Sequence, residues 1–234
     1  FPTRRSSDLV DSYAGQLEKA AMSIHGYAEL GLEETKSSKL LADMLEKGGF
    51  RVERGVADMP TAFVATWGSG KPVVGILAEF DALPGLSQKA ANPLQVPEIE
   101  GGPGHGCGHN LFGAGSVGAA LAMKTAMEKN KIPGTVKLFG TPAEEITIGK
   151  GYMIKAGVFD GVDVCLNWHP SGQNKLHLAS NRALNSFEVI FRGKTAHAAG
   201  GPWDGRSALD AVELMDAGVN FLREHVKEIG RAHV

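Results

Sequence analysis

The sequence predicts an α/β fold, with a largely parallel sheet flanked by helices, followed by the start of a second, α+β domain. Apolar residues recur at helical spacing between residues 13 and 47. Short apolar segments then alternate with helical ones up to about residue 168, which is typical of parallel sheets. After about residue 180 the pattern changes, so we expect a second domain there.

The individual elements follow from this patterning. Two helices are predicted within 13–47, the second ending at Gly48 and Gly49, and a third over 111–129. Strands are predicted over 50–54, 62–67, 73–78, 136–140 and 162–168. The segment 73–78 is almost continuously apolar, as expected of a strand buried on both faces. Beyond residue 180, alternation over 186–191 indicates a half-exposed strand and 207–225 an amphipathic helix.

The two ends of the chain lack the patterning of a folded domain. Residues 1–9 have no apolar face. Within residues 228–234, Gly230 breaks an otherwise regular helical pattern. Each end resembles the conceptual translation of a sequencing adapter, so we interpret both as artefacts. The first domain is then expected over 10–182 and the beginning of the second over 183–227.

Composition excludes several classes of protein. The net charge is −2 and there is no basic run, so nothing supports binding to nucleic acid or to an anionic membrane. The two cysteines, Cys107 and Cys165, argue against a disulfide-stapled secreted scaffold. Cys165 lies in a predicted buried strand and is interpreted as a small core residue. With no signal-peptide pattern and no apolar span, we expect a cytoplasmic protein.

The stretch Gly104–His109 alternates glycine with side chains that can bind metals. In an extended segment, His105, Cys107 and His109 would all point to one face. The glycines would leave the opposite face bare, so that another segment could approach closely. A glycine-rich loop with incidental histidines explains this stretch equally well when it is taken alone.

Four polar clusters follow predicted strands or lead into a predicted helix. They are Glu79/Asp81, Cys107/His109, Glu144/Glu145 and His169. Such strand ends share one edge of a parallel sheet, and Cys, His and carboxylate ligands together suit zinc or a similar metal. Adjacent glutamates fit a division in which one binds metal and the other moves a proton. Taken alone, the glutamate pair indicates a solvated turn and His169 a structural histidine, so the prediction rests on their convergence.

The glycines over 113–118 spell the G-x-G-x-x-G pattern of dinucleotide-binding proteins. That motif needs a preceding apolar strand and an acidic residue closing the next strand, and this sequence has neither. We interpret these glycines as sites of close helix packing. A nicotinamide-dependent enzyme is therefore a distant alternative.

Several motifs, in this order and spacing, resemble the M20 family of metallopeptidases and amidohydrolases. They are AEFDALPGLS, GPGHGCGHN, GTPAEE, NWHP and GKTAHAAGGPWDGRSALDA. The branch most similar is the aminobenzoyl-glutamate utilisation type of hydrolase. The resemblance implies a zinc-exopeptidase-like catalytic domain over 10–182 and a truncated dimerisation, or lid, domain over 183–227.

The resemblance also implies a site with two divalent metal ions, zinc or manganese, with cobalt a further option. Its implied metal ligands are Cys107 in the shared position, His109, Glu145 and His169. Glu144 would be the general base, and His197 would reach a neighbouring active site across a dimer to stabilise the oxyanion. Asp81 and His105 would support the ligands from behind. Glu79 and Asp81 stand where many relatives carry His-x-Asp, and the missing histidine favours Asp81 as the supporting group.

The implied activity is metal-dependent hydrolysis of an amide bond, in p-aminobenzoyl-glutamate or a similar N-acyl amino acid. An M20-type dipeptidase is the alternative, and a non-catalytic metal-binding or dimerising module is the alternative for this chain alone. The implied assembly is a homodimer through the inserted domain, or a hetero-oligomer with a related subunit. Family members carry a further metal-binding histidine beyond the point where this sequence ends, so we expect this chain to be inactive and its parent to be an enzyme.

Overall fold

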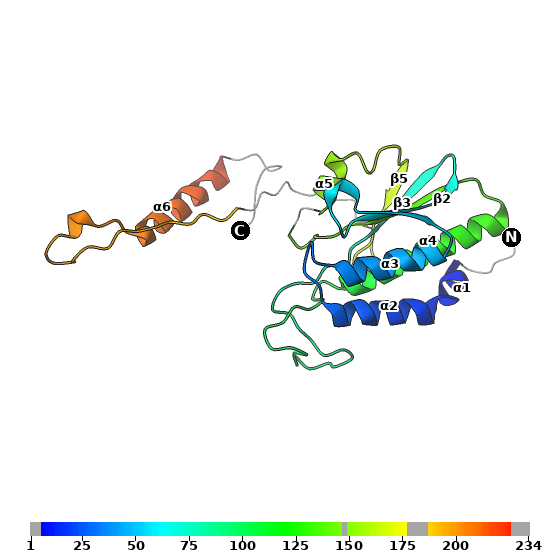
Figure 1. Ribbon diagram of the computed structural model, residues 1–234, viewed down its shortest axis with the longest axis horizontal. Helices are drawn as coiled ribbons and strands as arrows, with labels where there is room; N and C mark the ends of the chain where they lie inside the picture. The colour runs from blue at the N-terminus through cyan, green and yellow to red at the C-terminus, as the bar shows by residue number, and fades with distance from the viewer. Residues whose placement is uncertain (1–5, 147–148, 177–186, 226–234) are drawn as a thin grey trace. The chain divides into compact units, whose positions relative to one another are not determined.

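The computed structural model describes residues 6–146, 149–176 and 187–225, and the chain divides into two compact units, Phe1–Gln173 and Asn174–Val234. The first unit is an α/β domain (Figure 1). Its helices are α1 (Ser6–Asp11), α2 (Ala14–Tyr27), α3 (Thr35–Lys47), α4 (His109–Asn130) and α5 (Gly149–Lys155). Its strands are β1 (Arg51–Arg54), β2 (Phe63–Ser69), β3 (Val73–Ala78), β4 (Gly134–Gly140) and β5 (Val164–Leu166). The helices and strands predicted in this unit are therefore confirmed.

The sheet is mixed, whereas the alternation of strands and helices predicts a largely parallel one. Its strand order is β1-β2-β4-β3-β5, and β3 pairs in parallel with both β4 and β5. In contrast, β2 runs antiparallel to both β1 and β4. The parallel prediction is thus correct for the three strands that precede polar clusters and wrong for β1 and β2.

Short connections explain why β1 and β2 do not run parallel to their neighbours. Residues 55–62 join β1 to β2, and residues 70–72 join β2 to β3. A parallel connection within one sheet needs about a dozen residues or more, so both segments are too short for it. The long connection through α4 is sufficient, and it places β4 between β2 and β3.

Different helices cover the two faces of the sheet. On one face α3 and α4 pack against the strands, with α2 as a further layer behind them (Figure 1). Phe63 of β2 and Leu138 of β4 belong to the core on this side. Met153 of α5 packs on the other side against Val64 and Phe139. Successive strand residues point to opposite faces, so neighbouring residues of β2 and β4 serve different cores.

The glycines of α4 let neighbouring segments approach this helix closely. A Cβ atom at Gly113 would lie 2.9 Å from Cδ1 of Leu41 and 3.0 Å from the carbonyl oxygen of Glu79. A Cβ atom at Gly118 would lie 2.4 Å from Cδ1 of Leu17. The interpretation of the G-x-G-x-x-G pattern as close helix packing is confirmed, and α4 can hold its first residue beside the end of β3.

Two expectations from composition, the burial of Cys165 and the lack of a membrane-spanning segment, can be compared with the structure. Cys165 lies in β5 as predicted but is exposed, so its interpretation as a core residue is wrong. The reason is that β5 forms an edge of the sheet and is exposed along its described length. None of the helices in the described part of the chain is long and apolar enough to cross a membrane.

The second unit contains the helix predicted over 207–225, observed as α6 (Ala208–Phe221), whose first turn is capped by the Ser207 hydroxyl. The strand predicted over 186–191 is not formed in its described part, 187–191. A strand needs a partner, and the described residues of this unit provide only the isolated bridge Lys194–Arg206. The predicted domain boundary after residue 182 and the predicted artefact over 228–234 lie outside the described residues, whereas α1 begins within 1–9.

Candidate metal centre

The polar clusters meet where the three parallel strands end. Glu79 and Asp81 follow β3, the glutamate pair follows β4 and His169 follows β5. The first residue of α4, His109, lies between these segments, fully buried. The parallel part of the mixed sheet is what brings these segments to one edge.

The loop before α4 does not have the extended geometry expected from its alternating glycines. Residues 105–108 form a turn closed by a hydrogen bond from the Gly108 amide to the carbonyl of His105, and Gly108 is left-handed at φ 77°. His105 therefore turns away and its Nε2 lies 3.1 Å from the carbonyl of Ile24 in α2. Cys107 and His109 do converge, so the expectation that all three side chains share one face is wrong for His105 alone.

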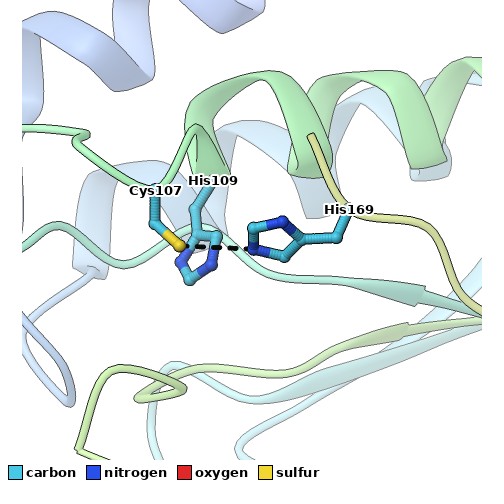
Figure 2. Close-up of side chains that lie close together, drawn as sticks. All are labelled: Cys107, His109 and His169. Atoms are coloured by element: carbon cyan, nitrogen blue, oxygen red, sulfur yellow. Dashed lines mark hydrogen bonds between the residues drawn. The ribbon is translucent and has the colours of Figure 1, made fainter. Parts of the chain in front are cut away.

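Cys107, His109 and His169 form a first group of potential metal ligands. One potential ligand atom from each lies within 4.8 Å of the others, and Figure 2 shows the three side chains converging. The Sγ atom of Cys107 lies 3.3 Å from Nε2 of His169. Nδ1 of His169 lies 2.9 Å from the carbonyl oxygen of Pro170, to which it can donate. That hydrogen bond leaves the Nε2 lone pair directed at the group, as metal-binding histidines require.

His109 belongs to a second group as well, with Glu79 and Glu144. Its Nε2 lies 3.0 Å from Oε2 of Glu79 and 3.7 Å from Oε2 of Glu144. Its Nδ1 lies 3.0 Å from Oδ1 of Asp81, which is itself buried. Asp81 is thus placed where it can orient the imidazole of His109, and its role as a supporting group stays a prediction.

The atoms facing this centre fit a bound cation. Among the described residues, Oε2 of Glu79, Nε2 of His109 and Oε1 of Glu145 are buried and have no well-formed hydrogen bond. Buried polar atoms normally have well-formed hydrogen bonds, so three atoms without one around the same imidazole are unusual, although Oε2 of Glu79 and Nε2 of His109 face each other at 3.0 Å. Carboxylate and imidazole atoms together are a donor set that divalent metal ions bind well.

The electrostatics of the centre are dominated by its carboxylates. Burial alone would lower the pKa of His109, but its contacts with the carboxylates of Asp81 and Glu79 outweigh burial and raise this pKa to about 10. Burial raises the pKa of the Cys107 thiol to about 11, and the neighbouring Glu145 adds to the effect. Burial also raises the pKa of Glu144, again helped by the charge of Glu79. Without a metal ion, the centre therefore holds an imidazolium and a neutral thiol.

The two adjacent glutamates differ in their surroundings. Glu144 belongs to the second group, and its side chain is 36% exposed. Glu145 is more buried, with Oε1 3.8 Å from Nδ1 of His109, and it is in neither group. Its amide donates a hydrogen bond of 2.8 Å to Oδ2 of Asp81. The assignment of base to Glu144 and ligand to Glu145 stays a prediction.

Two residues of the centre are not among the predicted site residues. Glu79 is 3% exposed, and its other oxygen, Oε1, lies 2.5 Å from Nζ of Lys150 in α5. The family's histidine is missing at the position of Glu79, and for this reason the resemblance favours Asp81 over Glu79. Nothing in the sequence around Lys150 indicates that its ammonium group lies against a carboxylate after β3.

The two remaining predicted residues lie elsewhere. His105 lies beside His25, with ring centroids 6.4 Å apart, and burial lowers its pKa to about 4. His197 belongs to the second unit, where its Nδ1 accepts hydrogen bonds from the amides of Ala199 and Gly200. Its Nε2 therefore carries the proton and is available as a donor. The roles proposed for both histidines stay predictions.

Comparisons with known proteins point in the same direction as this geometry. The profile of Peptidase family M20/M25/M40 matches residues 75–227. The chain is 43% identical to a subunit of p-aminobenzoyl-glutamate hydrolase from Escherichia coli (strain K12), over 97% of the chain and 47% of that protein. It is 34% identical to Xaa-Arg dipeptidase of Mus musculus, over 98% of the chain and 52% of that protein.

A solved structure is also similar to this chain. The crystal structure of the Bacillus subtilis YXEP protein, described as a dinuclear metal binding peptidase from the M20 family, superimposes with a TM-score of 0.59. The two are 26% identical over 69% of this chain and 44% of that one. The chain spans about half the length of the curated relatives that it matches.

Proposed function

Because this chain belongs to peptidase family M20/M25/M40, we propose that it carries most of a two-metal centre that hydrolyses an amide bond in an N-acyl amino acid. The observation that supports this most is the pair of potential ligand groups that share His109 and surround it with buried atoms lacking well-formed hydrogen bonds. By similarity to the Escherichia coli relative, p-aminobenzoyl-glutamate is the first candidate substrate. The activity belongs to the full-length protein, since the chain spans about half of that relative.

Cys107, His109 and His169 are proposed to hold one metal ion, with Glu145 and Glu79 as carboxylate ligands to the pair. Bound metal ions of this kind polarise a carbonyl group and lower the pKa of water. Asp81 holds the Nδ1 proton of His109 and so keeps the Nε2 lone pair free for binding.

Glu144 is the proposed general base. Its carboxylate is at the centre but still partly exposed, so Oε2 can accept a proton from water and pass it to the leaving nitrogen. His197 is the proposed donor to the carbonyl oxygen, because the hydrogen bonds at Nδ1 keep the proton on Nε2. In the proposed assembly a homodimer, or a pairing with a related subunit, supplies this histidine to the neighbouring active site.

A dipeptidase is the second candidate function. It is supported by the Xaa-Arg dipeptidase of Mus musculus, whose similarity covers 98% of this chain and 52% of the dipeptidase. Both activities would use the same centre and differ in the groups flanking the scissile bond. The choice between them therefore requires a substrate panel.

The test uses the full-length protein, loaded with zinc or with manganese, and measures glutamate release from p-aminobenzoyl-glutamate beside a panel of dipeptides. Glu144→Gln should lose orders of magnitude in kcat and keep its metal, and the exposed Glu128→Gln should behave as wild type. Turnover of dipeptides alone would support the second candidate. Absence of any metal-dependent turnover, or a fully active Glu144→Gln variant, would overturn the proposal.

A further inference from the structure

We propose that Glu34, a buried residue outside the metal centre, is a positioning residue for Glu144 and Glu145. It acts by holding the backbone turn at residues 141–145, from which both glutamates project. The inference rests on the proposed function, because it assigns Glu34 a role at that same centre.

Three alternate amides of this turn are each held by a buried acceptor. The amide of Thr141 donates to the carbonyl oxygen of Ala78 at 2.8 Å. The amide of Ala143 donates to Oε1 of Glu34 at 2.7 Å, and the amide of Glu145 donates to Oδ2 of Asp81 at 2.8 Å. The first anchor is strand backbone and the third belongs to the metal centre. Glu34 supplies the middle anchor, directly before Glu144.

Both oxygens of Glu34 are engaged in this arrangement. The residue is 0% exposed, and its Oε2 accepts a hydrogen bond of 3.0 Å from the hydroxyl of Thr61, which is also buried. A carboxylate with such fixed partners is restricted to one orientation. Burying an ionised group is unfavourable unless hydrogen bonds compensate, so a glutamate at this position costs folding free energy that a small apolar residue would not.

Helix capping does not explain why a glutamate stands here. Glu34 occupies the N-cap position of α3, but its side chain makes no capping hydrogen bond. The amides of Lys36 and Ser37 donate to Glu29 instead, at 2.9 and 2.8 Å. The carboxylate of Glu34 thus does not accept hydrogen bonds from the first amides of α3 and is directed at the turn instead.

The turn needs such an anchor because its backbone is strained. Ala143 is left-handed, at φ 58°, a conformation that residues with a Cβ atom rarely adopt. It is also packed tightly, since a Cβ atom at Gly31 would lie 3.1 Å from Cα of Ala143. A relaxed turn would rotate the following peptide and carry both glutamates away from His109. Strain of this kind persists where the surroundings fix it, which is what Glu34 does.

The test compares Glu34→Leu, Glu34→Gln and the control Glu33→Leu, at an exposed neighbouring position, in the full-length protein. Metal affinity is measured by competition with a chromogenic chelator, kcat and KM by turnover, and folding by thermal melting. Glu34→Leu should weaken metal affinity and lower kcat, each by about 10- to 100-fold, with little change in KM. Glu34→Gln should stay close to wild type, because its amide oxygen can still accept from Ala143 and its NH2 can donate to Thr61.

A folded Glu34→Leu protein with wild-type metal affinity and kcat would overturn the inference and leave the proposed function intact. If wild type binds metal but has no turnover, the proposed function fails, and metal affinity still decides the role of Glu34. If Glu34→Leu does not fold, Thr61→Val is tested in its place, because it removes the hydrogen bond that the Thr61 hydroxyl donates to the Glu34 carboxylate. It should lower metal affinity and kcat together, and unchanged values would overturn the inference.

Discussion

Replacing Asp81 with asparagine removes one of two carboxylate oxygens, each of which accepts a hydrogen bond in the centre. Oδ1 of Asp81 lies 3.0 Å from Nδ1 of His109, and Oδ2 accepts the amide of Glu145 at 2.8 Å. Asparagine has nearly the same shape, but it offers one oxygen and one NH2 group. Either the Glu145 amide or the imidazole must then face a donor.

Both outcomes weaken metal binding. If the NH2 group faces the Glu145 amide, a buried donor is left unpaired, at a cost of about 1–3 kcal/mol. The metal-free protein avoids this cost by releasing the turn, and metal binding, which needs the turn in place, must then bear it. If it faces Nδ1 of His109, an NH2 donor points at a nitrogen whose proton is shared with the backbone carbonyl of Asp81 at 3.1 Å. Two donors facing each other displace the imidazole from the position in which Nε2 can bind a metal. A penalty of about 1–3 kcal/mol corresponds to roughly 5- to 150-fold in metal affinity, which is the loss we expect.

The assay is a competition titration of the metal-free full-length protein with zinc, with thermal melting to show that the variant is folded. Asp163→Asn is a matched control, since Asp163 holds the amide of Val73 at the opposite end of β3. It should bind metal as wild type does. A folded Asp81→Asn protein that binds zinc within about twofold of wild type would refute the proposed role of Asp81, since the unpaired donor alone predicts a larger loss.

Two further predictions concern protons and packing. Because the pKa values of His109 and Cys107 are raised to about 10 and about 11, both groups are protonated at pH 8. Metal binding should release about two protons there, so affinity should rise by roughly 100-fold per pH unit between pH 7 and 9, measured by calorimetry in buffers of different ionisation enthalpy. A pH-independent affinity would contradict this. Gly149→Ala should displace the glutamate turn and lower metal affinity at least tenfold, since its Cβ atom would lie 1.7 Å from the carbonyl oxygen of Pro142. Gly151→Ala, whose Cβ atom meets nothing within 4 Å, is the control on the same helix, and equal affinity of the two variants would refute the packing argument.

Most elements of the first unit could be predicted from the sequence, because periodicity reports burial and burial follows the faces of helices and strands. Strand direction could not be read in this way, because an apolar strand has the same pattern in either direction. The length of the connections between the strands was the feature of the sequence that indicates strand direction. Residues 70–72 are too few for a crossover, so β3 had to run opposite to β2.

The position of the candidate site could be predicted because polar residues directly after short apolar segments are conspicuous. Its supporting residues were not, since their role depends on burial that one sequence does not reveal. Glu34 follows another glutamate at the start of a helix, where acidic residues usually face solvent, yet it is fully buried. Lys150 looks like a surface residue of a short helix, and its contact with Glu79 depends on how α5 packs.

The charges of the centre differ in sign, and a proton on His109 compensates part of them when no metal ion is bound. Four carboxylates, those of Glu79, Asp81, Glu144 and Glu145, lie close to His109, which stands at the N-terminus of α4, where the helix dipole disfavours an imidazolium. The pKa of His109 is nevertheless raised to about 10, because the contacts with Asp81 and Glu79 outweigh burial. A proton on His109 therefore compensates part of the negative charge in the metal-free protein. A bound metal ion would replace this proton with a larger positive charge among the same carboxylates, which is why its binding should release the proton.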